Sequence, residues 1–257
     1  MCLKVNIMIS VLTLNDEKYR KLADLTAIKN KKAYCEKHGY IFHHVTDAGE
    51  SLCGKPLKAG NPPIEQGFSP LGWGKVYAMK DVMDKYPETP WVFNTDTDAM
   101  ITNMDRKLED IIKICAEQNT HIIIPADING INCGNMFVKN SDIGRAFLDT
   151  VIAGMPLYRN WYMFENQLMQ DLLVGTHLEE TGITQGGTLW SRVGKVVPQR
   201  LFNSYDYKGH PTLKNRSHFN DILGTDGQWK SGDFMIQWPA TSLEYRIEQA
   251  NIILISP

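Results

Sequence analysis

Short apolar runs alternate with segments of helical periodicity over about the first 175 residues, and this alternation constrains the fold more than any other feature. The β-branched run from Val5 to Leu12 predicts a first strand. A helix start follows at Asn15, where an acidic first turn suits the positive end of the helix dipole. We expect this helix to end at Gly39 and a second strand to span Tyr40 to Val45. The order strand, helix, strand predicts a parallel sheet covered by helices.

The same alternation continues after residues 46–72, whose four prolines and five glycines we interpret as a long surface excursion. Beyond residue 175 the chain is irregular, with candidate strands only at Val193 to Val197 and at Asp233 to Trp238. Between residues 72 and 175 we expect two strands, Trp91 to Phe93 and His121 to Pro125. We also expect three amphipathic helices, whose apolar faces are Val76, Met79, Met83 and Tyr86; Leu108, Ile111, Ile112 and Cys115; and Ile143, Ala146, Phe147 and Val151.

Charge and composition exclude several classes of protein. The 27 basic and 29 acidic residues create no basic field of the kind that nucleic-acid-coating proteins carry, so no nucleic-acid partner is expected. No apolar stretch reaches the roughly 18 residues of a spanning helix, and the five cysteines show no CxxC spacing. These absences predict reduced thiols and a cytoplasmic location. The alternative is that a membrane anchor upstream of this chain was removed.

Two aspartates, Asp96 and Asp98, follow the predicted strand that starts at Trp91. In an open α/β sheet, ligands bind beyond the carboxyl ends of the strands, and side chains two residues apart in an extended segment point the same way. Both carboxylates could therefore hold one hard cation bound to a diphosphate. A solvated turn that caps the next helix is the alternative. A phosphohydrolase of the haloacid dehalogenase type also uses two aspartates, but Met100 stands where its motif requires Thr or Val.

The surrounding segment GWGKVYAMKDVMDKYPETPWVFNTDTDAMITN resembles the donor-site block of the retaining GT-A-fold glycosyltransferases that include the yeast α-galactosyl- and α-mannosyltransferases and the plant xyloglucan xylosyltransferases. DINGINCGNMFVKNS, FENQLMQDLL, QRLFNSY and GDFMIQW resemble later blocks of that family in the same order. Together the blocks cover about two thirds of the chain. The matching positions in the first block are Trp73, Lys75, Pro87, Trp91, Asp96, Asp98 and Ala99.

The resemblance implies a metal site for Mn²⁺ or Mg²⁺ at Asp96 and Asp98, with Lys75 on the donor side. Members of the family supply a histidine as the third metal ligand, but this chain has Gln237 at that position. A glutamine oxygen can ligate a hard ion, although as a neutral group it should bind more weakly. His210 and His218 are the nearest histidines that could substitute for it.

Further roles are implied for polar residues in the other blocks. Asp127, Asn129 and Asn132, with Gly134, are expected to recognise sugar hydroxyls, although the same residues suit a plain turn. We also expect Thr13 and Thr97 to line the donor site. Glu165, Asn166 and Gln167 match the position near the anomeric carbon, where a group must stabilise positive charge or form a transient bond. Six aromatic residues could stack on an acceptor or fill a core: Trp161, Tyr162, Trp190, Tyr205, Tyr207 and Trp229.

The expected fold is therefore a single GT-A-like α/β domain over residues 1–257, Rossmann-like, with a mixed central sheet. Residues 1–140 would bind the nucleotide sugar, and residues 141–257 would form the acceptor side. The expected activity is retaining transfer of a hexose or pentose from a nucleoside-diphosphate sugar, with a UDP-sugar favoured over GDP-mannose, to a glycan or glycoprotein hydroxyl. A non-catalytic sugar-nucleotide or glycan-binding relative is the alternative. Most members of the family sit in the Golgi behind an anchor.

Overall fold

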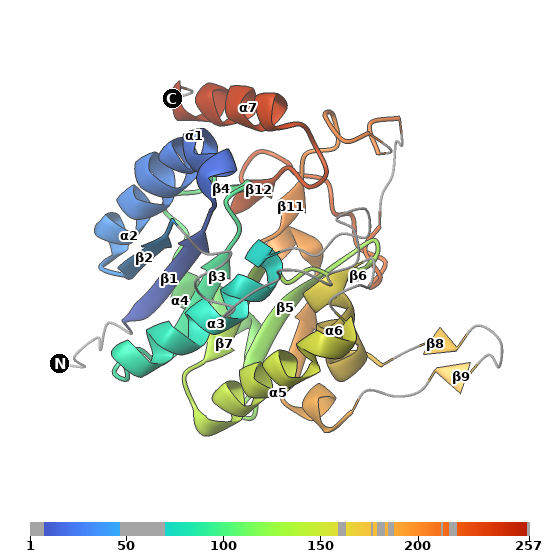
Figure 1. The fold of residues 1–257 in the computed structure, drawn as a ribbon. Helices are drawn as coiled ribbons and strands as arrows, with labels where there is room; N and C mark the ends of the chain where they lie inside the picture. The colour runs from blue at the N-terminus through green and yellow to red at the C-terminus, as the bar shows by residue number, and fades with distance from the viewer. Residues whose placement is uncertain are drawn as a thin grey trace, which may run out of the picture.

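The computed structural model describes residues 8–46, 70–158, 163–175, 177–178, 183–184, 188–211, 213–215 and 220–255. Within them, helices cover both faces of a central mixed sheet (Figure 1). Most of the predicted surface excursion, together with Trp161, Tyr162 and His218, lies outside the described residues. The excursion ends earlier than expected, because Pro70 already opens a helix, at the first position where a missing N–H costs nothing.

The main sheet has the strand order β10-β5-β7-β3-β1-β2, and β6 pairs with β5. In it β1 is parallel to β2 and β3, β10 is parallel to β5, and β7 runs antiparallel between β3 and β5. The mixed sheet expected from the family resemblance is thus confirmed. Its strands are β1 (Ile9–Leu14), β2 (Ile41–Val45), β3 (Trp91–Thr95), β5 (Ile122–Asp127), β6 (Gly130–Ile131), β7 (Asn135–Lys139) and β10 (Gly194–Val197).

Alternating side chains along these strands build two cores. Leu12, Val92 and Val138 face the helices α3, α5 and α6, whereas Val11 and Phe93 face α2 and α4 on the opposite side. Because successive side chains of a strand point to opposite faces, near-continuous apolar strands are what a sheet covered on both faces requires. The covering helices are α2 (Ala33–His38), α3 (Pro70–Lys85), α4 (Leu108–Cys115), α5 (Asp142–Tyr158) and α6 (Phe164–Leu173).

A smaller sheet of β11 (Ser204–Tyr205), β12 (Met235–Gln237) and β4 (Ala99–Ile101) extends the molecule beyond the carboxyl end of β3. β12 is antiparallel to β4, with Gln237 opposite Ala99. The pairing therefore brings the predicted strand at 233–238 beside the aspartate segment. The remaining short elements are β8 (His177–Leu178), β9 (Ile183–Thr184), η4 (Leu189–Arg192) and η5 (Gln199–Leu201).

The C-terminal helix α7 (Leu243–Ile255) was not predicted from the sequence. Its apolar side chains Leu243, Ile247 and Ala250 pack with Leu22 and Trp238 in a third cluster, between the first helical segment and the small sheet (Figure 1). No helix of the described residues is both long enough and apolar enough to cross a bilayer.

The first helical segment differs in detail from the prediction. Asp16, not Asn15, is the N-cap, because its side chain accepts a hydrogen bond from the Tyr19 N–H. The end at Gly39 is confirmed, since this residue adopts the left-handed conformation with φ 75°. Between these ends the segment changes winding several times, as η1 (Glu17–Tyr19), α1 (Arg20–Ala23), the π-helical η2 (Asp24–Lys32) and α2.

Candidate active site

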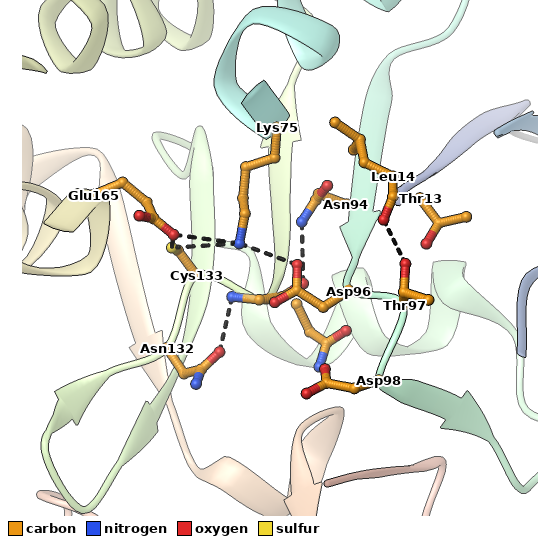
Figure 2. A network of polar contacts seen from close by, with 12 residues as sticks. Thr13, Leu14, Lys75, Asn94, Asp96, Thr97, Asp98, Asn132, Cys133 and Glu165 are labelled. Carbon is orange, nitrogen blue, oxygen red and sulfur yellow. Dashed lines mark hydrogen bonds and ion pairs between the residues drawn. The ribbon is translucent and has the colours of Figure 1, made fainter. Parts of the chain in front are cut away.

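The two aspartates lie where the sequence predicted, in the turn between β3 and β4 (Figure 2). The Asp96 N–H donates to the Gly134 carbonyl over 2.8 Å, and the Ala99 N–H closes the turn on the Asp96 carbonyl over 3.1 Å. The Thr97 hydroxyl donates to the Leu14 carbonyl at the end of β1. The backbone of this turn is therefore tied to both neighbouring strands, and its side chains open into a pocket of about 250 Å³.

A buried lysine connects the aspartates with a glutamate across the pocket. Lys75 Nζ lies 3.0 Å from Asp96 Oδ1 and 3.5 Å from Glu165 Oε1, and only 6% of the Lys75 side chain is exposed (Figure 2). The Cys133 thiol donates to the same Glu165 oxygen over 3.5 Å. Glu165 Oε2 is buried and has no hydrogen-bond partner among the described residues. One oxygen of this carboxylate, packed against Gly72, is thus left without a fixed partner, which is unusual for a buried polar atom.

Charge pairing sets the protonation of these groups. Burial lowers the pKa of Lys75, but the carboxylates of Asp96 and Glu165 more than offset this, and the net direction is upward. Burial raises the pKa of Asp96 to about 6, against the opposing effect of Lys75. The Asp96 side chain keeps 35% exposure on the pocket side. Lys75 therefore stays a cation beside the two carboxylates.

A second buried lysine, which was not predicted from the sequence, contacts the backbone of the aspartate turn. Lys31 of η2 is fully buried, and its amine donates to the Asp96 carbonyl over 2.6 Å and to the Thr13 hydroxyl over 3.5 Å. Burial lowers the pKa of this amine to about 7, while Asp96 and Asp98 act in the opposite direction. Thr13 therefore contacts the turn through Lys31 and is not among the residues that line the pocket.

Gly134 leaves a space at which three candidate ligand side chains converge. A Cβ at this glycine would lie 2.6 Å from Asp96 Oδ2, 2.7 Å from Asn132 Oδ1 and 3.0 Å from Gln237 Nε2. Carboxylate and amide oxygens are the donors that Mn²⁺ and Mg²⁺ accept, so the residues present fit a divalent ion at Asp96 and Asp98. In the described part of the chain, no third His, Cys, Asp or Glu completes a cluster with the aspartates.

The amide of Gln237 is held in one orientation by a chain of neighbouring amides. Its nitrogen donates to Asp98 Oδ1 over 3.1 Å, and its oxygen accepts from Asn135 over 3.2 Å. Asn135 in turn donates to Asn203 over 2.6 Å. In this arrangement Gln237 positions Asp98, and its oxygen would reach a cation only if the amide turned over. His210, a candidate substitute, uses Nδ1 to accept from the Leu213 N–H.

The residues expected to recognise sugar hydroxyls form a hydrogen-bonded group at the end of β5. Asp127 accepts from the Tyr205 hydroxyl over 2.9 Å and from the Asn129 N–H over 2.6 Å. Asn132 donates to the Tyr205 hydroxyl over 2.6 Å, and its oxygen accepts from the Gly134 N–H. Burial raises the pKa of Asp127. Tyr205 thus belongs to the same hydrogen-bonded group as Asp127 and Asn132, whereas the sequence predicted for it a stacking or core role.

The structure separates the three residues proposed near the anomeric carbon. Glu165 lines the pocket, and Gly72 makes room for it, because a Cβ at Gly72 would lie 2.3 Å from Glu165 Oε2. Asn166 accepts from the Cys133 N–H over 2.7 Å and so joins α6 to the segment before β7. Gln167 donates to Asp171 on its own helix. Only Glu165 of the three lines the pocket with Asp96 and Asp98.

Arg246 of α7 and Tyr19 complete the lining of the pocket, and neither was found from the sequence. Arg246 Nη1 lies 3.3 Å from Asp98 Oδ2, with 11% of the arginine side chain and 15% of the aspartate side chain exposed. Of the aromatic candidates, Trp190 packs on Phe147 in the core. Trp229 lines a second pocket of about 650 Å³ behind β12.

Comparison with known sequences identifies relatives of this chain. A model of the galactosyl transferase GMA12/MNN10 family matches residues 5–114 and 113–241. An alpha-1,2-galactosyltransferase of Schizosaccharomyces pombe is 28% identical over 212 residues, which cover 70% of this chain and 50% of that protein. The "Probable alpha-1,6-mannosyltransferase MNN10" of Saccharomyces cerevisiae is 24% identical over 204 residues, which cover 70% and 47%. The chain therefore spans about half the length of these curated relatives.

A solved structure has the same fold. The crystal structure of a glycosyltransferase involved in the glycosylation of the major capsid of PBCV-1 superposes with a TM-score of 0.64. The match covers 95% of this chain and 99% of that chain, at 16% sequence identity. At this identity the likeness concerns the fold alone, and it confirms the GT-A architecture expected from the sequence.

Proposed function

The chain belongs to the galactosyl transferase GMA12/MNN10 family, and from this premise we propose that it transfers a hexose or pentose from a nucleoside-diphosphate sugar to a glycan hydroxyl with retention of configuration. The observation that carries the proposal is the single pocket shared by Asp96, Asp98, Lys75 and Glu165. A UDP-sugar is the favoured donor, since the family description and the fission yeast relative both name galactosyl transfer. GDP-mannose is the second candidate, because another relative is named a mannosyltransferase.

Breaking the bond between the sugar and the diphosphate places negative charge on the leaving group and positive charge on the sugar ring. A bound Mn²⁺ or Mg²⁺, held by Asp96 and Asp98, would supply positive charge to the leaving diphosphate. Asn132 would offer its side-chain oxygen to the same ion, and Gln237 would do so only after its amide turned over. Lys75 supports this role, because its buried ammonium already lies 3.0 Å from Asp96.

Glu165 is the residue proposed to face the positive charge on the sugar ring. Its Oε1 is held by Lys75 and Cys133, and its Oε2 has no fixed partner in the described part of the chain. A carboxylate held in this way can stabilise an oxocarbenium-like centre, or form a bond to it for the lifetime of an intermediate. Asp127, Asn129 and Asn132 are proposed to bind sugar hydroxyls at the neighbouring strand end.

The test is a donor panel on the purified chain. UDP-galactose, UDP-glucose, UDP-xylose and GDP-mannose are each incubated with and without Mn²⁺ in the presence of mannoside and galactoside acceptors. Nucleotide release and transfer of labelled sugar are measured, and the product anomer is assigned by NMR. We expect Mn²⁺-dependent transfer from one donor with an α-linked product, and at least a hundredfold loss on Asp98→Asn or Glu165→Gln.

Three other results of this donor panel would each indicate a different function or mechanism. Binding of a donor without release of nucleotide would identify a non-catalytic relative and contradict the proposal. Release of nucleotide without any glycosylated acceptor would favour hydrolysis. A β-linked product would show inversion and remove the proposed role of Glu165.

A further inference from the structure

Both carboxylate oxygens of Asp98 already have a partner within the protein. Its Oδ1 accepts from Gln237 Nε2 over 3.1 Å, and its Oδ2 forms the 3.3 Å ion pair with Arg246 Nη1. Asp96 differs, because among the described residues only its Oδ1 is held, by Lys75, while its Oδ2 lies beside Gly134. The two aspartates of the motif are therefore not equally available to an incoming cation.

Arg246 is held in place by more than its ion pair. Its Nε donates to the Thr241 hydroxyl over 3.2 Å, and its guanidinium carbon lies 5.9 Å from the centre of the Tyr19 ring. Its Nη2 makes no hydrogen bond to the described residues, and the side chain lines the same pocket as Lys75. The guanidinium can therefore contact a ligand in the pocket while its stem stays fixed.

Arg246 and a divalent cation compete for Asp98. Both are drawn to the same carboxylate, and two positive charges a few ångströms apart in a largely buried site repel each other. A ligand that draws the guanidinium away removes this competition. Phosphate oxygens are suited to do so, because the planar guanidinium binds them through two parallel hydrogen bonds.

We propose that Arg246 makes metal binding at the aspartates depend on the nucleotide diphosphate: it neutralises Asp98 in the empty pocket and transfers to a diphosphate oxygen when the donor enters. This inference rests on the proposed function of the pocket. It gives Arg246 two alternative partners, Asp98 without the donor and the diphosphate with it. By linkage, the factor by which the diphosphate raises metal affinity equals the factor by which metal raises diphosphate affinity.

The test measures Mn²⁺ binding by the electron paramagnetic resonance of free Mn²⁺, with and without saturating UDP. Arg246→Met keeps the apolar stem on Tyr19 and removes the charge, and Arg246→Gln keeps a hydrogen-bonding group near Thr241. Either variant should bind Mn²⁺ alone about tenfold more tightly than the unaltered chain. Each should bind UDP in the presence of EDTA about tenfold more weakly, by calorimetry.

Arg200→Met is the matched control, because Arg200 forms a comparable ion pair with Asp233, at 2.7 Å, and does not line the pocket. It should lower thermal stability as the Arg246 variants do, but leave both affinities unchanged. If the Arg246 variants bind Mn²⁺ alone no better than the unaltered chain, while UDP still promotes Mn²⁺ binding, the gating role is wrong and the proposed function stands. If no variant binds Mn²⁺ with or without UDP, the metal site itself is wrong and the inference is overturned with it.

Discussion

At the scale of single residues, two cations from distant segments hold the aspartate turn. The fully buried Lys31 amine donates to the Asp96 carbonyl over 2.6 Å, and Arg246 Nη1 lies 3.3 Å from Asp98 Oδ2. Each cation therefore contacts one of the two aspartates.

The burial of Lys31 predicts a pH dependence of stability. Its pKa is about 7 in the folded chain, against 10.5 as the ordinary lysine value, because burial disfavours the ammonium. Between pH 7 and pH 10.5 the folded chain binds fewer protons than the unfolded chain. The free energy of unfolding should therefore increase as the pH is raised through this window, and decrease as it is lowered toward pH 7. The contribution is at most about 1.4 kcal/mol per pH unit.

Lys31→Met should remove that rise. Urea unfolding at several pH values between 7 and 9.5 measures it, with the exposed Lys21→Met as the control that keeps the slope. If Lys31→Met and the unaltered chain show the same slope, the amine does not titrate in this range, and the description of its environment is wrong.

The sequence reveals site residues that directly follow a strand, but not those that reach the site from other segments. Asp96 and Asp98 could be predicted because an apolar strand ends just before them. Lys31 could not, since a lysine in a helix looks the same in sequence whether it is exposed or buried. Arg246 contacts Asp98 across more than half of the chain, and no local pattern records such a pairing.

At the scale of elements, the sequence pattern predicted the strands β1, β2, β3, β5 and β10 and the helices α3, α4 and α5, but it did not predict β6 or β7, and it failed where the winding of a helix changes. The predicted helix after the first strand contains the π-helical segment η2. This winding turns three polar side chains toward the aspartate segment: Thr26 donates to the Thr97 carbonyl, Asn30 pairs with Ile101, and Lys31 donates to Asp96. Short π-helical segments are common at functional sites. The helix α7 was missed because its amphipathic pattern is weak: it packs Leu243, Ile247 and Ala250 into the third cluster but also carries the exposed apolar residues Ile252 and Ile255.

Asn30 tests the coupling between η2 and the aspartate segment. Its side chain is buried and both donates to the Ile101 carbonyl, over 2.9 Å, and accepts from the Ile101 N–H, over 2.8 Å. Asn30→Ala should lower the free energy of unfolding by about 2–3 kcal/mol, because two buried backbone groups lose their partner. It should also weaken Mn²⁺ binding, since β4 starts one residue after Asp98. The substitution Lys29→Ala, at the neighbouring exposed residue, should change neither the free energy of unfolding nor the Mn²⁺ affinity. If Asn30→Ala binds Mn²⁺ as tightly as the unaltered chain, η2 does not influence the metal site.

At the scale of the whole molecule, the order of the sheet explains why distant segments share one pocket. β3 and β5 both run antiparallel to β7, so their carboxyl ends lie at the same edge and bring Asp96 and Asp127 to one side of the molecule. The small sheet then adds Gln237, and α3, α6 and α7 add Lys75, Glu165 and Arg246. The mixed character of the central sheet was expected from the family resemblance, whereas its strand order and the contribution of α7 to the pocket emerged only from the three-dimensional structure.

The central claim is that Asp96 and Asp98 hold a divalent cation bound to the diphosphate of a sugar donor. The most direct measurement is the anomalous diffraction of Mn²⁺ in crystals grown with UDP. We predict one strong peak within about 2.5 Å of a carboxylate oxygen of each aspartate and of the diphosphate, with Arg246 turned away from Asp98. A peak remote from both side chains, or UDP bound in the pocket without manganese, would contradict the account.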